Sequence, residues 1–275
     1  MVQAKGIQSI ETGFRVLHAL ETSPRPLTLS EVAKESGIAT SNARFYLVSL
    51  MRVGAVTQTA YGRYKLGPAA LRIGLAALSQ LEILELARAE LESLRDVTGD
   101  TVFLSVWSDR GPVVVNRVDG EKMAPLGVRV GSLVPLTHSA TGMAFLSYLP
   151  LAATRSLLKR ESHIPGRKGR PALVRAPIEE VVSEVRRLGF AKNTGGVLAG
   201  IVALAAPVVN HEGAVQCVVT LMGMEDDMDI SESGQPARRL LEMTQGISRA
   251  GGFTGKHASH PGFGREAAVR IRGAA

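Results

Sequence analysis

The sequence has a single cysteine, few aromatic residues and no long apolar run. Cys217 stands alone among 275 residues, which excludes an internal disulfide and a cysteine-rich zinc site. No apolar segment is long enough to cross a membrane, and the N-terminal residues lack the apolar core of a secretory signal. We therefore expect a cytoplasmic protein without a membrane partner.

The motifs of common enzyme classes are also missing. There is no Gly-x-Ser-x-Gly elbow, no glycine-rich phosphate loop and no histidine pair spaced for a metal. Cys217 lies in an apolar, strand-like run, where a buried thiol is inert. His138 stands beside Ser139, but no acidic residue is placed to complete a catalytic triad. We therefore expect no enzyme activity, no cofactor and no metal.

Residues 28–66 have the pattern of a winged helix-turn-helix. Thr28 and Glu31 have the Thr-x-x-Glu spacing of a capping box, which begins a helix. Gly37 can adopt the left-handed conformation that ends this helix. A second helix is predicted to begin at residues 40–41, where either hydroxyl group can cap it.

The second helix has an apolar face and a polar face, as a recognition helix requires. Ala43, Leu47 and Leu50 fall at i, i+4 and i+7 and form the apolar face. The polar face and the N-terminal turn can contact base edges and phosphates, and the wing adds two cations for the backbone. The predicted DNA contacts are Thr40, Ser41, Asn42, Arg44, Phe45, Arg63 and Lys65.

Flanking segments complete the small domain. Ile10, Phe14 and Leu17 predict a first helix that closes its core, with Ser9 as the cap. Residues 55–66 read as a hairpin with a glycine-containing tip, which forms the wing. The alternative is that these helices only pack together and bind no DNA.

The charge distribution favours DNA binding. Residues 1–80 carry nine Lys or Arg against four Glu, whereas residues 81–250 carry 19 basic and 20 acidic residues. Residues 251–275 hold four basic residues against one Glu. The basic excess therefore lies on the winged domain and the tail, as neutralisation of DNA phosphates requires.

A helical connector follows the wing. Gly67 ends the wing and Pro68 suits the first turn of a helix. Leu71, Leu75 and Leu78 then form one apolar stripe. This stripe packs either on the same helix of a second subunit or on the chain's own winged domain. The first alternative gives a two-fold dimer that reads a palindromic DNA site.

The pattern changes after residue 100 to short apolar strands, turns and helices. Strand hairpins with intervening helices indicate an α+β domain on an antiparallel sheet, which can hold a small-molecule pocket. We predict strands at 102–107, 113–118, 126–130, 201–209 and 214–222, and helices at 139–149, 178–188 and 235–248.

One segment of this domain has the chemistry of an anion site. Residues 137–142 are small and polar and lead into a helix, whose free N–H groups attract anions. Gly142 would let a carboxylate approach the backbone. The alternative is a plain capped helix packed closely on the sheet.

The order of these features resembles the IclR family of bacterial transcriptional regulators, over residues 7–250. The resemblance implies a winged-helix domain, a helical linker and a C-terminal effector domain of GAF-like fold. It also implies dimers, often paired into tetramers, that regulate catabolic genes in response to small organic acids or aromatic degradation products. The blocks that carry it are 10–17, 29–33, 64–67, 98–102, the segment around Asp119, 130–136, 140–144 and 203–208.

The resemblance also implies the effector contacts. Asn193 stands where the family often has an acid, and Ala203 stands where it often has a cysteine. We therefore expect a pocket that accepts a larger or more apolar ligand. Phe45 replaces a frequent basic residue, and its ring either contacts a thymine methyl or packs on the wing. The predicted ligand contacts are Ala140, Thr141, Gly142, Asn193, Ala203, Thr220 and Met222.

Taken together, these features predict a ligand-responsive DNA-binding transcriptional regulator. Its expected partners are a palindromic double-stranded DNA operator, a small organic acid effector and further copies of the chain. The alternatives are a constitutive DNA binder with a vestigial sensor domain, and a small-molecule enzyme with a regulatory DNA-binding head. The predicted domains are 1–67 (winged helix-turn-helix), 68–83 (linker helix), 84–250 (effector domain) and 251–275 (flexible basic tail).

Overall fold

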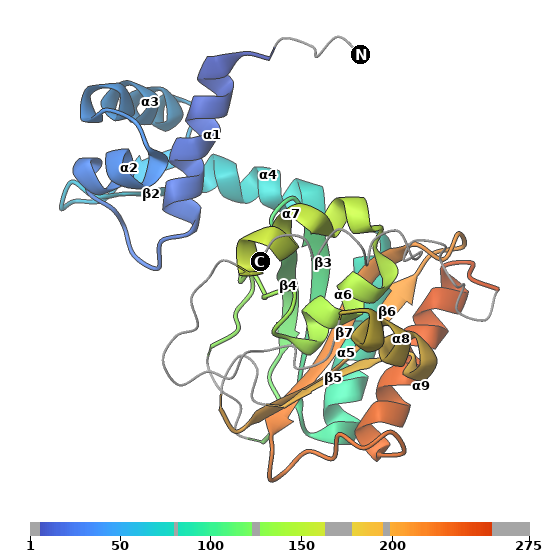
Figure 1. Cartoon of the computed structure of the whole chain (residues 1–275). Helices are drawn as coiled ribbons and strands as arrows, with labels where there is room; N and C mark the ends of the chain where they lie inside the picture. Colours follow the sequence, from blue (N-terminus) through green and yellow to red (C-terminus); the bar gives the residue numbers. More distant parts are fainter. Residues whose placement is uncertain (1–5, 80–81, 123–126, 163–177, 195–198, 255–275) are drawn as a thin grey trace. The chain divides into compact units, whose positions relative to one another are not determined.

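The chain consists of two compact units, Met1–Leu81 and Glu82–Ala275. Their boundary lies inside the segment predicted as the linker helix. A helix long and apolar enough to cross a membrane is not found among the described residues. The computed structural model describes residues 6–79, 82–122, 127–162, 178–194 and 199–254 (Figure 1).

The N-terminal unit is a winged helix-turn-helix. Three helices precede a two-stranded antiparallel wing, and a fourth follows it. Thr28 and Glu31 form the predicted capping box, and Gly37 ends the second helix at φ 65. The elements are α1 (Gln8–Glu21), α2 (Leu29–Ser36), α3 (Thr40–Arg52), β1 (Val56–Gln58), β2 (Tyr64–Leu66) and α4 (Pro68–Ser79).

The core of this unit uses the predicted face of α3 but a different face of α1. Ala43 and Leu47 of α3 are fully buried. The helix itself was predicted correctly and Leu17 packs against the core, but the prediction was wrong for Ile10 and Phe14, which are 56% and 67% exposed. Val16 and its neighbours on the adjoining stripe are buried instead.

The predicted side-chain caps of α1 and α3 are also wrong. Ile7 and Ala39 occupy the N-cap positions, and neither accepts a side-chain hydrogen bond. Ser9, Thr40 and Ser41 lie inside the first turns of their helices. The hydroxyl groups of α3 are therefore not used to cap it.

The C-terminal unit is built on a five-stranded antiparallel sheet in the order β4-β3-β7-β6-β5. This arrangement confirms the α+β prediction. The strands are β3 (Thr101–Ser108), β4 (Gly111–Val118), β5 (Ala191–Thr194), β6 (Ile201–Val209) and β7 (Val215–Met224). The helices are α5 (Glu82–Thr98), α6 (Ala140–Tyr148), α7 (Leu151–Ser162), α8 (Ile178–Leu188) and α9 (Gln235–Ala250).

Helices lie on both faces of the sheet (Figure 1), and each face has its own hydrophobic core. Alternate residues of a strand point to opposite faces. Leu204, Val219 and Leu221 are fully buried on the face that α5 and α9 cover. Ala205 and Val218 belong to the other core, which α6 and α8 cover. The predicted ligand residues lie on this second face.

Three local features differ from the predictions. Helix α7 and strand β5 were not predicted. The strand expected at 126–130 is wrong over its described residues 127–130, which form turns and irregular backbone. The chain returns to β4 only afterwards, where Val134 N donates to Pro112 O at 2.9 Å.

Candidate DNA-binding surface and ligand site

Helix α3 presents the predicted contact residues to solvent. Thr40, Ser41, Asn42 and Arg44 are exposed, and within the described part of the chain none of them has a hydrogen-bonding partner for its side chain. Phe45 is 71% exposed, so its ring does not pack on the wing. All five side chains are therefore available to an external partner.

The two predicted cations of the wing differ in their surroundings. Lys65 is exposed and extends from β2. Arg63 is partly buried, and its Nη1 donates to Pro26 O and to Glu31 Oε2, each at 3.3 Å. Glu31 also accepts from Arg25, which together with the Thr28 backbone lowers the pKa of Glu31 to about 2. Sequence reasoning did not identify Arg25.

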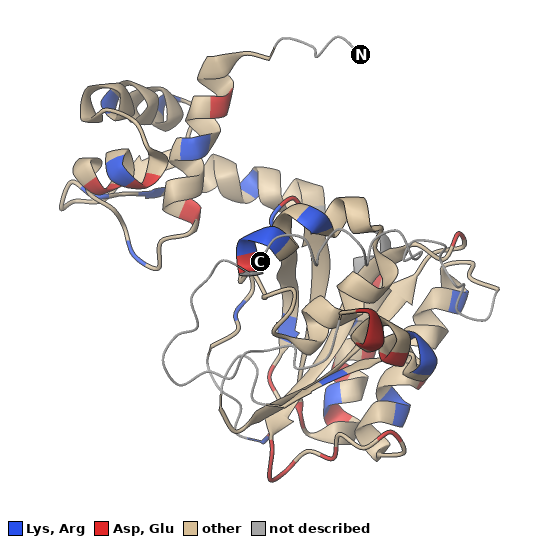
Figure 2. Cartoon of the chain, in the orientation of Figure 1, with Lys and Arg blue, Asp and Glu red and all other residues tan. Residues whose placement is uncertain are grey.

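Basic residues are distributed over the helices and wing of the N-terminal unit (Figure 2). Residues 1–80 have five more basic than acidic residues. A surface of this sign attracts the DNA backbone whatever its sequence. The exposed α3 side chains are the groups that can add sequence readout.

Cross-strand pairing brings three predicted ligand residues into one row on the sheet. Asn193 of β5 pairs with Ala203 of β6, and Ala203 pairs with Met222 of β7. Directly paired residues point to the same face. Asn193 and Ala203 are partly exposed, whereas Met222 is buried. The row therefore has one end that is open to solvent and one end inside the core.

The N-terminus of α6 faces this row. Ser139 caps the helix, with its Oγ accepting from Gly142 N at 2.9 Å. Thr141 and Thr220 of β7, each only 1% exposed, share a hydrogen bond of 2.8 Å. Within the described structure the backbone N–H groups of Ala140 and Thr141 have no acceptor. Two buried donors are thus unused at this turn.

Gly142 has a packing role here. A Cβ at this position would lie 2.2 Å from Pro135 O and 2.3 Å from Leu136 O. The helix can start this close to the preceding segment only with glycine. Because Ser139 already occupies the N–H of Gly142, this residue does not offer a free backbone donor to a ligand.

Two further contacts hold the segment before α6. Asn193 Nδ2 donates to His138 O at 2.8 Å. Glu161 of α7 accepts from Thr137 N at 2.8 Å and from Leu136 N at 2.5 Å. Glu161 was missed by sequence reasoning, although its isolation as the lone acid between residues 122 and 178 was a signal.

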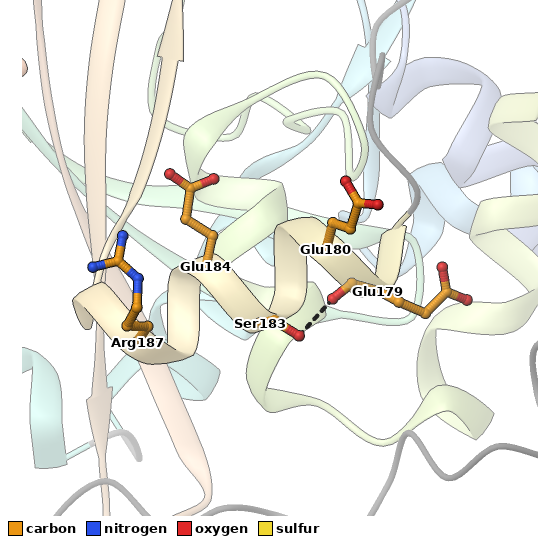
Figure 3. Close-up of a pocket in the computed structure, with 5 residues that line it drawn as sticks. All are labelled: Glu179, Glu180, Ser183, Glu184 and Arg187. Carbon is orange, nitrogen blue, oxygen red and sulfur yellow. Dashed lines mark hydrogen bonds between the residues drawn. The ribbon is translucent and has the colours of Figure 1, made fainter.

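A shallow hollow of about 430 Å³ lies along α8 (Figure 3). Its lining side chains all come from that helix, and they point in different directions rather than toward one centre. Ser183 Oγ donates to Glu179 O at 2.8 Å. No convergent set of groups marks this hollow as a ligand site.

Cys217, the chain's lone cysteine, lies in the hydrophobic core. Cys217 is fully buried, and burial raises the pKa of its thiol to about 12, so the thiol stays protonated and unreactive. Among the described residues there is no group of three His, Cys, Asp or Glu side chains that can hold a metal.

A winged helix-turn-helix joined to a sheet domain, in which a row of residues on the sheet lies beside a polar helix N-terminus, is the architecture of a ligand-responsive transcriptional regulator. Residues 9–60 match the IclR helix-turn-helix domain, and residues 75–249 match the bacterial transcriptional regulator IclR C-terminal domain. The chain belongs to the IclR family and is a ligand-responsive DNA-binding transcriptional regulator.

Individual relatives agree with this assignment. The glycerol operon regulatory protein of Streptomyces coelicolor is 30% identical over 206 residues, which cover 74% of this chain and 80% of that protein. The crystal structure of Pseudomonas aeruginosa HmgR is 33% identical, with a TM-score of 0.57, and the match covers 90% of this chain and 100% of that one.

A more distant structure shares the fold. An IclR homolog from Microbacterium hydrocarbonoxydans complexed with 4-hydroxybenzoate is 19% identical, with a TM-score of 0.73. The match covers 88% of this chain and 99% of that one.

Proposed function

We propose that α3 reads an operator in the major groove through Thr40, Ser41, Asn42, Arg44 and Phe45, while Lys65 and Arg63 bind the phosphate backbone. The exposure of the α3 side chains, and their lack of partners in the described chain, support this proposal. Arg44 can make a bidentate contact to guanine, and the Phe45 ring can cover a thymine methyl.

We further propose that two copies of the chain read a palindromic operator in the cytoplasm. Leu71 and Leu75 of α4 are 63% and 56% exposed, so they are not packed on the chain's own winged unit. This observation favours the second-subunit alternative for the apolar stripe. A two-fold dimer would place two α3 helices on half-sites one or more helical turns apart. Pairing of dimers into tetramers belongs to the same proposal.

The proposed effector is a small organic acid whose carboxylate binds at the start of α6. The observation that carries this proposal is the pair of unused N–H groups of Ala140 and Thr141 beside the buried Thr220 hydroxyl. A carboxylate is the anion that such donors suit. The apolar body of the acid would lie along Asn193, Ala203 and Met222, with Gly142 shaping the wall.

The ligand class agrees with what a structural neighbour holds. 4-Hydroxybenzoate, bound by the Microbacterium homolog, combines a carboxylate with an apolar ring. In this chain Ala203 and Met222 supply an apolar surface next to the polar turn, which suits a ring or a short aliphatic chain. Asn193 can donate to a substituent of such a ligand.

The test is a thermal-shift screen of the full chain with aliphatic and aromatic carboxylates, 4-hydroxybenzoate included, followed by DNA binding in the presence of each hit. In Asn193→Leu the melting temperature should no longer rise with the concentration of the hit compound, while the affinity for the operator stays unchanged. Gln216→Leu, an exposed position on β7, is the matched control and should respond as the native chain does. An unchanged dose–response of Asn193→Leu removes Asn193 from the ligand site.

The same experiment tests the alternative of a constitutive DNA binder. If no carboxylate shifts the melting temperature, and operator and random DNA bind equally well, the effector proposal fails. Turnover of a hit compound, followed by mass spectrometry, would instead reveal an enzyme with a DNA-binding head.

A further inference from the structure

The carboxylate of Glu31 joins two arginines that lie far apart in the sequence. Arg25 Nη2 donates to Glu31 Oε1 at 2.7 Å, and Arg63 Nη1 donates to Glu31 Oε2 at 3.3 Å. Pro26 O accepts from Nη1 of both arginines, at 3.4 and 3.3 Å. The loop before α2 and the wing are thus connected through one acidic group and one carbonyl.

The backbone holds this cluster in place from both sides. Thr28 N donates to Glu31 Oε2 at 2.7 Å as part of the capping box of α2. Leu27 and Tyr64 exchange two backbone hydrogen bonds of 2.9 and 2.7 Å, which join the loop to β2. The position of the Glu31 carboxylate is therefore set by the helix start and by the wing together.

The cluster has a net charge of one positive unit, and some of its N–H donors have no acceptor within the described structure. Two guanidinium groups, which are always charged, face one carboxylate, and the pKa of Glu31 of about 2 keeps that carboxylate ionised. Within the described structure Nε and Nη2 of Arg63 have no acceptor. Arg25 and Arg63 are 57% and 41% exposed, so these donors can be reached from outside.

We propose that Arg25 and Arg63 together bind one phosphate of the DNA backbone, with Glu31 as the residue that positions both. This proposal rests on the DNA-binding role of the winged unit. In helix-turn-helix complexes the first helix of the motif crosses the DNA backbone, and α2, which begins beside this cluster, is that helix. A guanidinium fork matches the two free oxygens of a phosphodiester.

The excess charge sets the number of phosphates. Two arginines would neutralise two phosphates if they acted separately, but Glu31 already balances one of the two charges. The cluster can therefore neutralise one phosphate and should contribute about 0.9 to the slope of log affinity against log salt concentration.

The experiment measures DNA affinity of the full chain by fluorescence anisotropy over a series of KCl concentrations. The probes are a duplex that the protein enriches from a random-sequence library and a duplex of random sequence. The variants are Arg25→Gln, Arg63→Gln and the double variant. Arg88→Gln, which replaces an exposed arginine of the C-terminal unit, is the matched control.

The double variant should weaken binding to both duplexes by the same factor and reduce the salt slope by about 0.9. A reduction of about 1.8 would show two separate phosphates and overturn the shared site. An unchanged slope, or a loss confined to the enriched duplex, would also overturn it. If the native chain binds neither duplex, the DNA-binding role itself fails, and that outcome is distinct from a failure of this site.

Glu31→Gln tests the positioning role. Glutamine can keep the capping box, so α2 should still form. Removing the negative charge leaves two uncompensated arginines, and the salt slope should become steeper by about 0.9 while discrimination between the two duplexes falls. A variant that binds more weakly with an unchanged slope would show that Glu31 acts only on the stability of the fold.

Discussion

Thr141 and Thr220 share a hydrogen bond of 2.8 Å that joins the first turn of α6 to the middle of β7. Both residues are 1% exposed, so the bond is shielded from water. Their neighbours on this face, among them Ala140 and Val218, are apolar. The pair therefore fixes the distance between the helix N-terminus and the strand on which the proposed ligand row ends.

The first prediction concerns this pair. Thr220→Val should destabilise the C-terminal unit by about 1–3 kcal/mol, because it leaves the Thr141 hydroxyl buried without its partner. Replacing both threonines by valine should cost much less than the sum of the single changes. Urea unfolding measures the free energies of the single and double variants. The probe is the fluorescence of Trp107, which lies in β3 and is the chain's lone tryptophan. Additive single effects would contradict the pairing.

The second prediction concerns Gly142. Gly142→Ala should destabilise the C-terminal unit by about 1–3 kcal/mol or more, because the new Cβ would meet two backbone carbonyls that cannot move aside easily. Gly246→Ala in α9 is the matched control, since nothing lies within 4 Å of its Cβ. That change should stabilise the unit by roughly 0.5–1 kcal/mol. Equal melting temperatures of the two variants would refute the packing role of Gly142.

The third prediction concerns Arg44 of α3. Arg44→Ala should weaken binding to an enriched duplex by about 1–3 kcal/mol and leave binding to random DNA nearly unchanged if Arg44 contacts a base. An equal loss on both duplexes would instead assign Arg44 to a phosphate. Arg52→Ala, at the opposite end of α3, serves as the control.

The fourth prediction concerns pH. Asp100 is fully buried, and burial raises its pKa above the ordinary value of 3.8 even though Lys122 Nζ lies 2.9 Å from its Oδ1. The folded carboxyl therefore holds its proton to higher pH than the unfolded one. The contribution of Asp100 to the free energy of unfolding is fully present below pH 3.8, the ordinary pKa. It is lost as the pH rises through the raised pKa of the folded protein.

Comparison with Asp100→Asn isolates that contribution. Urea midpoints of the two proteins are measured at several pH values between 3.8 and neutrality. The native chain should lose stability relative to the variant as pH increases over this range. Parallel profiles would mean that the Lys122 ion pair cancels the effect of burial.

The winged unit was the more predictable half because its signals are local. The Thr28 and Glu31 capping box, Gly37 and the wing each depend on a few neighbouring residues. The buried face of α1 was not predictable, since the helix has two apolar stripes and only the partner decides between them.

In the C-terminal unit the sequence-based predictions failed where contacts between distant parts of the chain determine the secondary structure. The residues of β5, Ala191–Thr194, have no strand pattern, and pairing with β6 makes them a strand. Helix α7 was missed because its inward positions include the polar Thr154, which is fully buried. The predicted strand at 126–130 has an alternating pattern, but Gly131 at φ 87 turns the chain before it joins β4.

Only part of the candidate site could be predicted from the sequence. The unused N–H groups at the start of α6 follow from the local sequence around Ser139. The placement of Asn193 beside His138 O depends on strand register, which no short motif determines. The Arg25 and Arg63 cluster requires a contact between a loop and the wing, and this contact also lies beyond local patterns.

The alternation along β7 makes the proposed sensor suitable for re-engineering. Thr220 and Met222 lie on the sheet face that α6 covers, whereas Val219 and Leu221 are buried in the core beneath α5 and α9. A combinatorial library of Met222, Asn193 and Ala203 would therefore vary the proposed ligand row and leave the core beneath α5 and α9 unchanged, with Thr220 kept for its hydrogen bond to Thr141. If the proposed effector site is correct, such a library is a route to biosensors for other carboxylic acids.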